Sequence, residues 1–160
     1  MPATLEKPIQ KNSPLSTVSA EIQLQEDIAD LLDNPYAFVM YVFDWGHGEL
    51  KDEAGPDEWQ TEILKYIGDK CLTVQDALRI AVRSGHGIGK TALIAWIILW
   101  FISTRPNPQI VVTANTGIQL ETKTWREVAK WHKLAINQHW FTWTATKFYN
   151  NTHPETWFAA

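Results

Sequence analysis

Apolar residues recur every three or four positions along several stretches of this chain, the spacing of helices that bury one face. Three residues mark expected helix boundaries: Pro35 as a first helical residue after Asn34, Gly68 as a C-terminal cap, and Thr116 as an N-terminal cap. One stretch is apolar all round and is expected to be a buried helix. The predicted helices cover residues 19–33, 35–43, 59–68, 92–102 (the buried one) and 116–134.

Shorter stretches have the pattern of strands. A β-branched run at 109–114 is bounded by turn residues, as is typical of a strand in a parallel sheet. Residues 78–83 predict a short strand before the buried helix, so that strand, helix and strand form a βαβ unit. Residues 140–149 alternate like a half-buried strand, and a turn at 150–154 leads to a last short strand at 156–158.

The composition allows one hydrophobic core. The chain has 160 residues, 45% of them apolar, a length that fits one domain rather than two. Its net charge of −4 gives no overall attraction to nucleic acid, so any contact with DNA would be local. Nine tryptophans are unusual for this length. Several are interpreted as core residues, and stacking on nucleic-acid bases is the alternative.

Three features bear on cellular location. Cys71 is the only cysteine, which excludes an internal disulfide and agrees with a reducing compartment. The apolar run at 92–102 is shorter than the roughly 20 residues needed to cross a bilayer. Residues 1–8 lack the basic and apolar regions of a secretory signal. The chain is therefore expected to be cytoplasmic and to have no membrane contact.

The most informative motif is the glycine-rich run Ser-Gly-His-Gly-Ile-Gly-Lys-Thr at residues 84–91. Glycine reaches positive φ without a steric penalty, so successive N–H groups of such a loop can surround one phosphate. Lys90 adds a positive charge, and the Thr91 hydroxyl can bind Mg²⁺. Ser84 departs from the usual motif, which has glycine there, and the neighbouring Gly85 can make the turn instead. The motif predicts a variant Walker A loop in an α/β fold of the P-loop NTPase type (RecA-like, ASCE) with a parallel sheet.

Further residues are candidates for contacts with a nucleoside triphosphate. Gln60 lies on the helix upstream of the loop, and its amide offers the donor and acceptor that match an adenine edge; an exposed helical glutamine is the alternative. Arg83 directly precedes the loop, where a guanidinium can stabilise charge developing on the γ-phosphate. Arg105 and Arg126 are expected to be solvated. The side chain of His86 is given no role, because a phosphate loop binds through its backbone.

Polar residues also follow the second predicted strand. Residues 113–116 and Gln119 open a helix at the carboxyl edge of the sheet, where open α/β sheets bind ligands. Helix capping by Asn115 and Thr116 explains them equally well. On the same helix, residues 125–133 interleave tryptophan with arginine and lysine, a weaker indication of contact with a nucleic-acid backbone.

An acidic pair for hydrolysis is missing. Hydrolysis requires carboxylates at the end of an apolar strand, which hold Mg²⁺ and orient the attacking water. After Lys90 the acidic residues are Glu121, Glu127 and Glu155, and none of them ends an apolar strand. The chain is therefore expected to bind ATP without hydrolysing it alone.

Together, these motifs resemble the start of the ATPase domain of the tailed-phage terminase large subunit, the motor that packages DNA into capsids. The resemblance covers residues 35–160 and rests on the motifs at 55–60, 83–91, 112–116 with Gln119, and 123–125. It implies ATP and Mg²⁺ as cofactors. For the complete protein it implies translocation of double-stranded DNA, a small terminase subunit and a portal as partners, a homo-oligomeric motor, and the cytoplasm of a bacterial host, with a phage or prophage origin.

The family pattern continues into an acidic Walker B strand and a nuclease domain, so the chain resembles an N-terminal fragment. It is expected to divide into a flexible tail at 1–18, a helical segment with the adenine motif at 19–70 and a truncated ATPase core at 71–160. Lys90 and Arg83 are the catalytic candidates, and Thr91 is the candidate metal ligand. The predicted nucleotide-binding residues are Gln60, Ser84, Gly85, His86, Gly87, Ile88, Gly89, Lys90 and Thr91.

Two other functions fit the same residues. A helicase-like motor ATPase would share them. The acidic strand and the segments that follow it would distinguish a helicase from a terminase. A noncatalytic nucleotide-binding module is the third hypothesis. Such a module would unfold cooperatively and bind nucleotide without help, whereas a fragment would expose apolar strand edges and aggregate.

Overall fold

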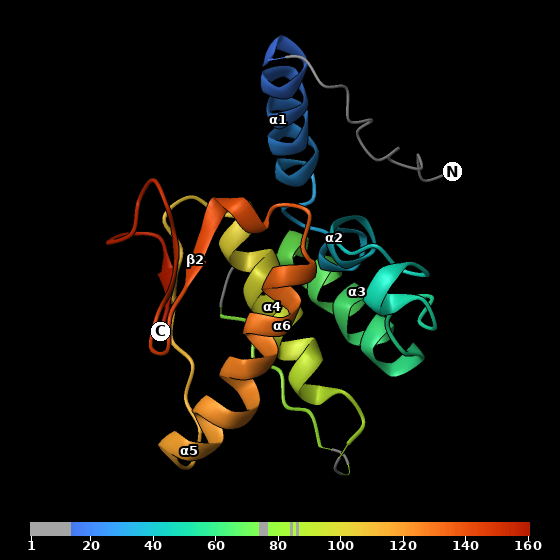
Figure 1. Ribbon diagram of the computed structural model, residues 1–160. Coiled ribbons are helices and arrows are strands. Elements are labelled where there is room, and N and C mark those ends of the chain that lie inside the picture. Colours follow the sequence, from blue (N-terminus) through green and yellow to red (C-terminus); the bar gives the residue numbers. More distant parts are fainter. Residues whose placement is uncertain (1–13, 74–76, 84, 86) are drawn as a thin grey trace.

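The computed structural model describes residues 14–73, 77–83, 85 and 87–160. The predicted tail up to residue 13, Ser84 and His86 lie outside these residues. Helix α4 (Lys90–Thr104) crosses the middle of the molecule (Figure 1). α2 (Pro35–Val42) and α6 (Arg126–Leu134) contact it, α3 (Glu58–Thr73) packs on α2, and α1 (Pro14–Ala29) reaches it from one end. The helix that carries Lys90 is thus supported by other helices along its length.

The helix boundaries agree with the sequence in part. Asn34 caps α2 as predicted, because its side-chain oxygen accepts the Ala37 N–H at 3.0 Å. α1 begins earlier than the predicted residue 19, inside the expected tail. The prediction that Gly68 ends α3 is wrong, since Gly68 lies inside that helix. A Cβ at Gly68 would lie 2.9 Å from the Asp33 carbonyl oxygen, so glycine permits a close approach of two backbones here.

The predicted long helix after Thr116 is present in three consecutive parts. Thr116 caps it as predicted, with its hydroxyl oxygen accepting the Gln119 N–H at 3.2 Å. A π-helical turn interrupts the regular helix before α6 begins. In order, the parts are α5 (Gly117–Gln119), η2 (Leu120–Trp125) and α6.

The strands form one small mixed sheet in the order β1-β4-β3-β2. β1 and β4 are parallel, whereas the β4–β3 and β3–β2 pairs are antiparallel. The predicted single strand at 140–149 is therefore a hairpin, closed by the Lys147 N–H donating to the Thr144 hydroxyl at 3.0 Å. The strands are β1 (Gln109–Ile110), β2 (Phe141–Trp143), β3 (Phe148–Asn150) and β4 (Phe158–Ala159).

The predicted strand at 78–83 is not formed. Residues 77–83 have no strand pairing within the described part of the chain, and Ile80 and Val82 are 42% and 41% exposed. A strand requires a hydrogen-bonded neighbour, and β1, the predicted partner in the βαβ unit, pairs with β4. β1 itself stops at Ile110, and Val111 is 80% exposed. The described sheet does not contain the predicted βαβ unit, and the P-loop fold stays a prediction.

One buried cluster joins the helices to the sheet, and tryptophans form a large part of it. This confirms that several tryptophans are core residues, including those that alternate with basic residues before and within α6. Arg105, expected to be solvated, instead stacks over the Trp100 ring at 4.3 Å and donates to the Leu32 carbonyl at 3.1 Å. Arg126 is exposed as expected. The buried tryptophans are Trp96, Trp100, Trp125 and Trp131.

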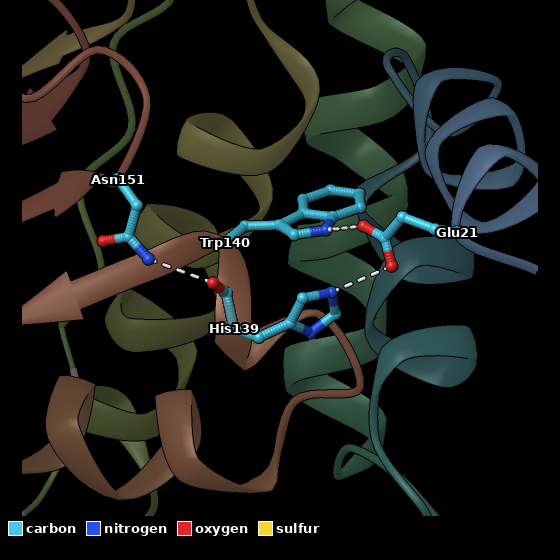
Figure 2. A network of polar contacts seen from close by, with 4 residues as sticks. All are labelled: Glu21, His139, Trp140 and Asn151. Carbon is cyan, nitrogen blue, oxygen red and sulfur yellow. Dashed lines mark hydrogen bonds and ion pairs between the residues drawn. The ribbon is translucent and has the colours of Figure 1, made fainter. Parts of the chain in front are cut away.

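A polar network ties α1 to the start of the sheet (Figure 2). Trp140 Nε1 and His139 Nε2 both bond to the Glu21 carboxylate, the latter at 2.9 Å. Asn151 Nδ2 donates to the His139 carbonyl at 3.0 Å and holds that turn in place. Burial raises the pKa of Glu21, but the hydrogen bonds from Trp140 and His139 outweigh it and the pKa lies below its ordinary value.

Acidification is therefore expected to weaken the attachment of α1. A carboxylate whose pKa is lower in the folded chain stabilises the fold above its unfolded pKa, and this contribution is lost as the pH falls through the folded value. We expect Glu21→Gln to flatten the dependence of the unfolding free energy on pH between about pH 5 and pH 3. Urea unfolding of parent and variant across this range measures the difference. If the unfolding free energies of the two proteins changed with pH in parallel, Glu21 would not be the group responsible.

Candidate nucleotide-binding site

The described part of the glycine-rich loop is a turn that leads directly into α4. Gly87 and Gly89 have φ of 80° and 82°, in the left-handed region that glycine enters without penalty. Gly89 is the N-cap of α4, and its carbonyl accepts the Leu93 N–H at 3.1 Å. The loop therefore ends where the first N–H groups of the helix lie and where the helix dipole is positive.

Lys90 and Thr91 occupy the first turn of α4. The Lys90 ammonium group donates a hydrogen bond to the Gly85 carbonyl, so the side chain folds back over the loop. Thr91 is half-buried beside it. A positively charged residue, a hydroxyl residue and the first N–H groups of a helix thus belong to one helical turn. Such groups can bind a phosphate together with Mg²⁺.

Gln60 is brought to this loop from α3. Its Nε2 donates to the Gly89 carbonyl at 3.0 Å, and its Oε1 accepts the Asp57 N–H at 2.8 Å. The residue is only 3% exposed, so the alternative of an exposed helical glutamine is excluded. The sequence predicted a role for Gln60 beside the loop but not this contact, although Asp57 and Gln60 have the spacing of a helix capping box.

The other predicted groups are exposed. Arg83 is exposed directly before the loop. Residues 113–116 and Gln119 are exposed after β1, and Thr116 serves as a helix cap. The structure therefore brings Gln60, Gly89 and Lys90 together, and it supports the capping interpretation for Thr116.

An apolar cavity of about 270 Å³ lies beside Lys90. It separates α3 from the segment 77–83 and from one face of α4. Lys90 is the one polar residue among those that line it, so a ligand bound at this end of α4 would find its other polar partners in the loop and the first helical turn. The cavity is lined by Ile63, Ile67, Ile80, Val82, Lys90, Leu93, Ile94 and Ile97.

Alanine at position 89 is expected to destabilise the fold by about 1–3 kcal/mol, because Gly89 has positive φ. The new Cβ would also lie 2.7 Å from Gln60 Nε2. Gly87→Ala is the matched control, since Gly87 has nearly the same φ and a Cβ there would meet no other atom within 4 Å. Urea unfolding compares the two variants. Equal destabilisation would show that the contact with Gln60 is unimportant.

Comparison with known proteins leaves the family open. No family model, curated protein or solved structure matches the chain. Among the described residues, no group of three or more histidine, cysteine, aspartate or glutamate side chains is arranged to hold a metal ion. No helix in the described ranges combines the length and the apolar character needed to cross a bilayer. The geometry of the loop and the motifs of the sequence are therefore the basis for a functional proposal.

Proposed function

We propose that this chain binds ATP at the loop before α4 and is the ATP-binding part of a DNA-packaging motor of the terminase type. The observation that carries the proposal is the turn through Gly87 and Gly89 at positive φ, followed at once by Lys90 and Thr91 on the first turn of a buried helix. Helix-terminal N–H groups, a positive charge and a hydroxyl at one helix end fit a triphosphate with Mg²⁺.

Each residue then has a distinct part. The loop and the first N–H groups of α4 bind the phosphate oxygens, Lys90 neutralises their charge, and the Thr91 hydroxyl binds Mg²⁺. Arg83, exposed beside the loop, adds a further positive charge. For the complete motor we propose double-stranded DNA, a small terminase subunit and a portal as partners, a homo-oligomeric assembly, and action in the cytoplasm of a bacterial host.

Hydrolysis is not proposed for this chain alone. Glu127 accepts a hydrogen bond from Trp131 Nε1 at 2.9 Å and belongs to α6. Glu155 lies 3.7 Å from Lys147, between β3 and β4. Glu121 lies in η2. None of the three carboxylates ends a strand beside the loop, the position from which an acidic residue holds Mg²⁺ and orients water. Binding without turnover is the activity that these residues support.

Titration with a fluorescent ATP analogue in the presence of Mg²⁺ tests the proposal. We expect saturable binding that unlabelled ATP and inorganic tripolyphosphate displace, and weaker binding when EDTA removes the Mg²⁺. Release of phosphate from ATP, measured in parallel, is expected to stay at the level without protein. A chain that unfolds cooperatively but binds none of these ligands would contradict the proposal.

A further inference from the structure

Gln60 has a place in the fold that an adenine contact does not explain. The residue is 3% exposed, and backbone groups occupy both ends of its amide. Nε2 donates to the Gly89 carbonyl at 3.0 Å, across 29 positions of sequence, and Oε1 accepts the Asp57 N–H at 2.8 Å. A buried amide is stable only when it is hydrogen-bonded, so the two bonds hold the start of α3 against the end of the loop.

The contact fixes a particular peptide group. The Gly89 carbonyl already accepts the Leu93 N–H at 3.1 Å, and Gln60 Nε2 uses its second lone pair. The carbonyl of Gly89 and the N–H of Lys90 belong to one planar peptide unit, so fixing the oxygen also fixes the direction of that N–H. The Lys90 N–H is one of the first donors of α4, the groups that the start of a helix presents to an anion.

The packing around Gly89 limits movement further. A Cβ on this residue would lie 2.7 Å from Gln60 Nε2, so the amide lies directly against the α-carbon of Gly89. Because Gly89 has a φ of 82°, its peptide could otherwise turn through the wide range of conformations open to glycine. The Gln60 side chain therefore acts together with the Leu93 N–H to hold a flexible residue in one conformation.

We propose that Gln60 is a positioning residue for phosphate binding: it sets the orientation of the peptide between Gly89 and Lys90 before a triphosphate binds. This inference rests on the proposed function, since it names how the same site is organised. It differs from the adenine contact expected from the sequence, which needs an amide edge that is open to a base. Positioning acts on the phosphate part of the ligand and is independent of the base.

Inorganic tripolyphosphate, which has no base, separates the two roles. Gln60→Met removes both hydrogen bonds at similar volume, and Gln60→Glu keeps the acceptor for Asp57 but loses the donor to Gly89. We expect the dissociation constants for tripolyphosphate, ATP and GTP to rise together in both variants by about tenfold, equivalent to one lost hydrogen bond. Glu62→Gln, an exposed change on the same helix, is the control and is expected to change none of them.

Unchanged tripolyphosphate binding with a reduced preference for ATP over GTP would overturn the proposal in favour of adenine recognition. Hydrogen exchange gives a second measurement that requires no ligand. Positioning predicts faster exchange confined to residues 87–93 in both Gln60 variants, whereas a general structural role predicts faster exchange throughout and a lower melting temperature. If the parent chain binds none of the probes, the proposed function is wrong. If amide exchange at residues 87–93 is also the same in the parent chain and the Gln60 variants, the positioning role is wrong as well.

Discussion

Replacing Lys90 by alanine is expected to lower the affinity for MgATP by about ten- to a hundredfold, the effect of one lost hydrogen bond to a charged group. Lys90 is the first residue of α4, and its ammonium group lies over the loop, where it donates to the Gly85 carbonyl. Removal of the charge leaves the N–H groups of the helix in place but takes away the group that we propose neutralises a bound triphosphate. Titration with a fluorescent ATP analogue measures the change.

The fold is expected to tolerate this substitution. Lys90 is half-buried, and alanine is a better helix former than lysine, so the melting temperature should change little. Lys51→Ala, on an exposed turn before α3, removes the same charge elsewhere and is expected to leave the affinity unchanged. Equal binding by the parent chain and Lys90→Ala would count against this loop as the phosphate site. Equal loss in both variants would indicate a non-specific effect of net charge.

Local signals in the sequence predicted the helices well. The Asn34 cap, the Thr116 cap and the apolar run of α4 act within a few residues of where they are found, and each is present in the structure. The prediction that Gly68 ends a helix is wrong because glycine is needed there for another reason. The backbone of Asp33, which is distant in sequence, lies too close to leave room for a side chain. A pattern read along one segment contains no information about such a neighbour.

The sheet and the site depend more strongly on distant partners. Residues 78–83 have a strand-like composition, but a strand forms only beside another strand, and the described residues place none there. The glycines and Lys90 predict the loop from the sequence alone. The hydrogen bond between Gln60 and Gly89 could not be predicted, because 29 positions separate the two residues and the fold brings α3 beside the start of α4.

The largest loss of stability is expected from Trp131→Ala, at about 3–5 kcal/mol, because removal of a buried tryptophan leaves a cavity in the core. Trp131 is 2% exposed, and its ring centroid lies 4.9 Å from both the Phe43 and the Trp96 rings. It also lies 5.7 Å from the Trp45 ring, so it joins α6 to α4 and to the residues after α2. A stability of about 5–15 kcal/mol is typical of a domain, and the variant is expected to be marginal.

Urea unfolding followed by far-UV circular dichroism avoids the change in fluorescence that any tryptophan substitution produces. Trp143→Ala is the matched control, since Trp143 lies on β2 and is 36% exposed, and its removal should affect stability much less. Trp131→Phe keeps an aromatic ring but loses the 2.9 Å hydrogen bond to Glu127, so it is expected to fall between the parent and alanine. Similar losses from the substitutions at 131 and 143 would mean that the ring contacts of Trp131 do not hold α6 against α4.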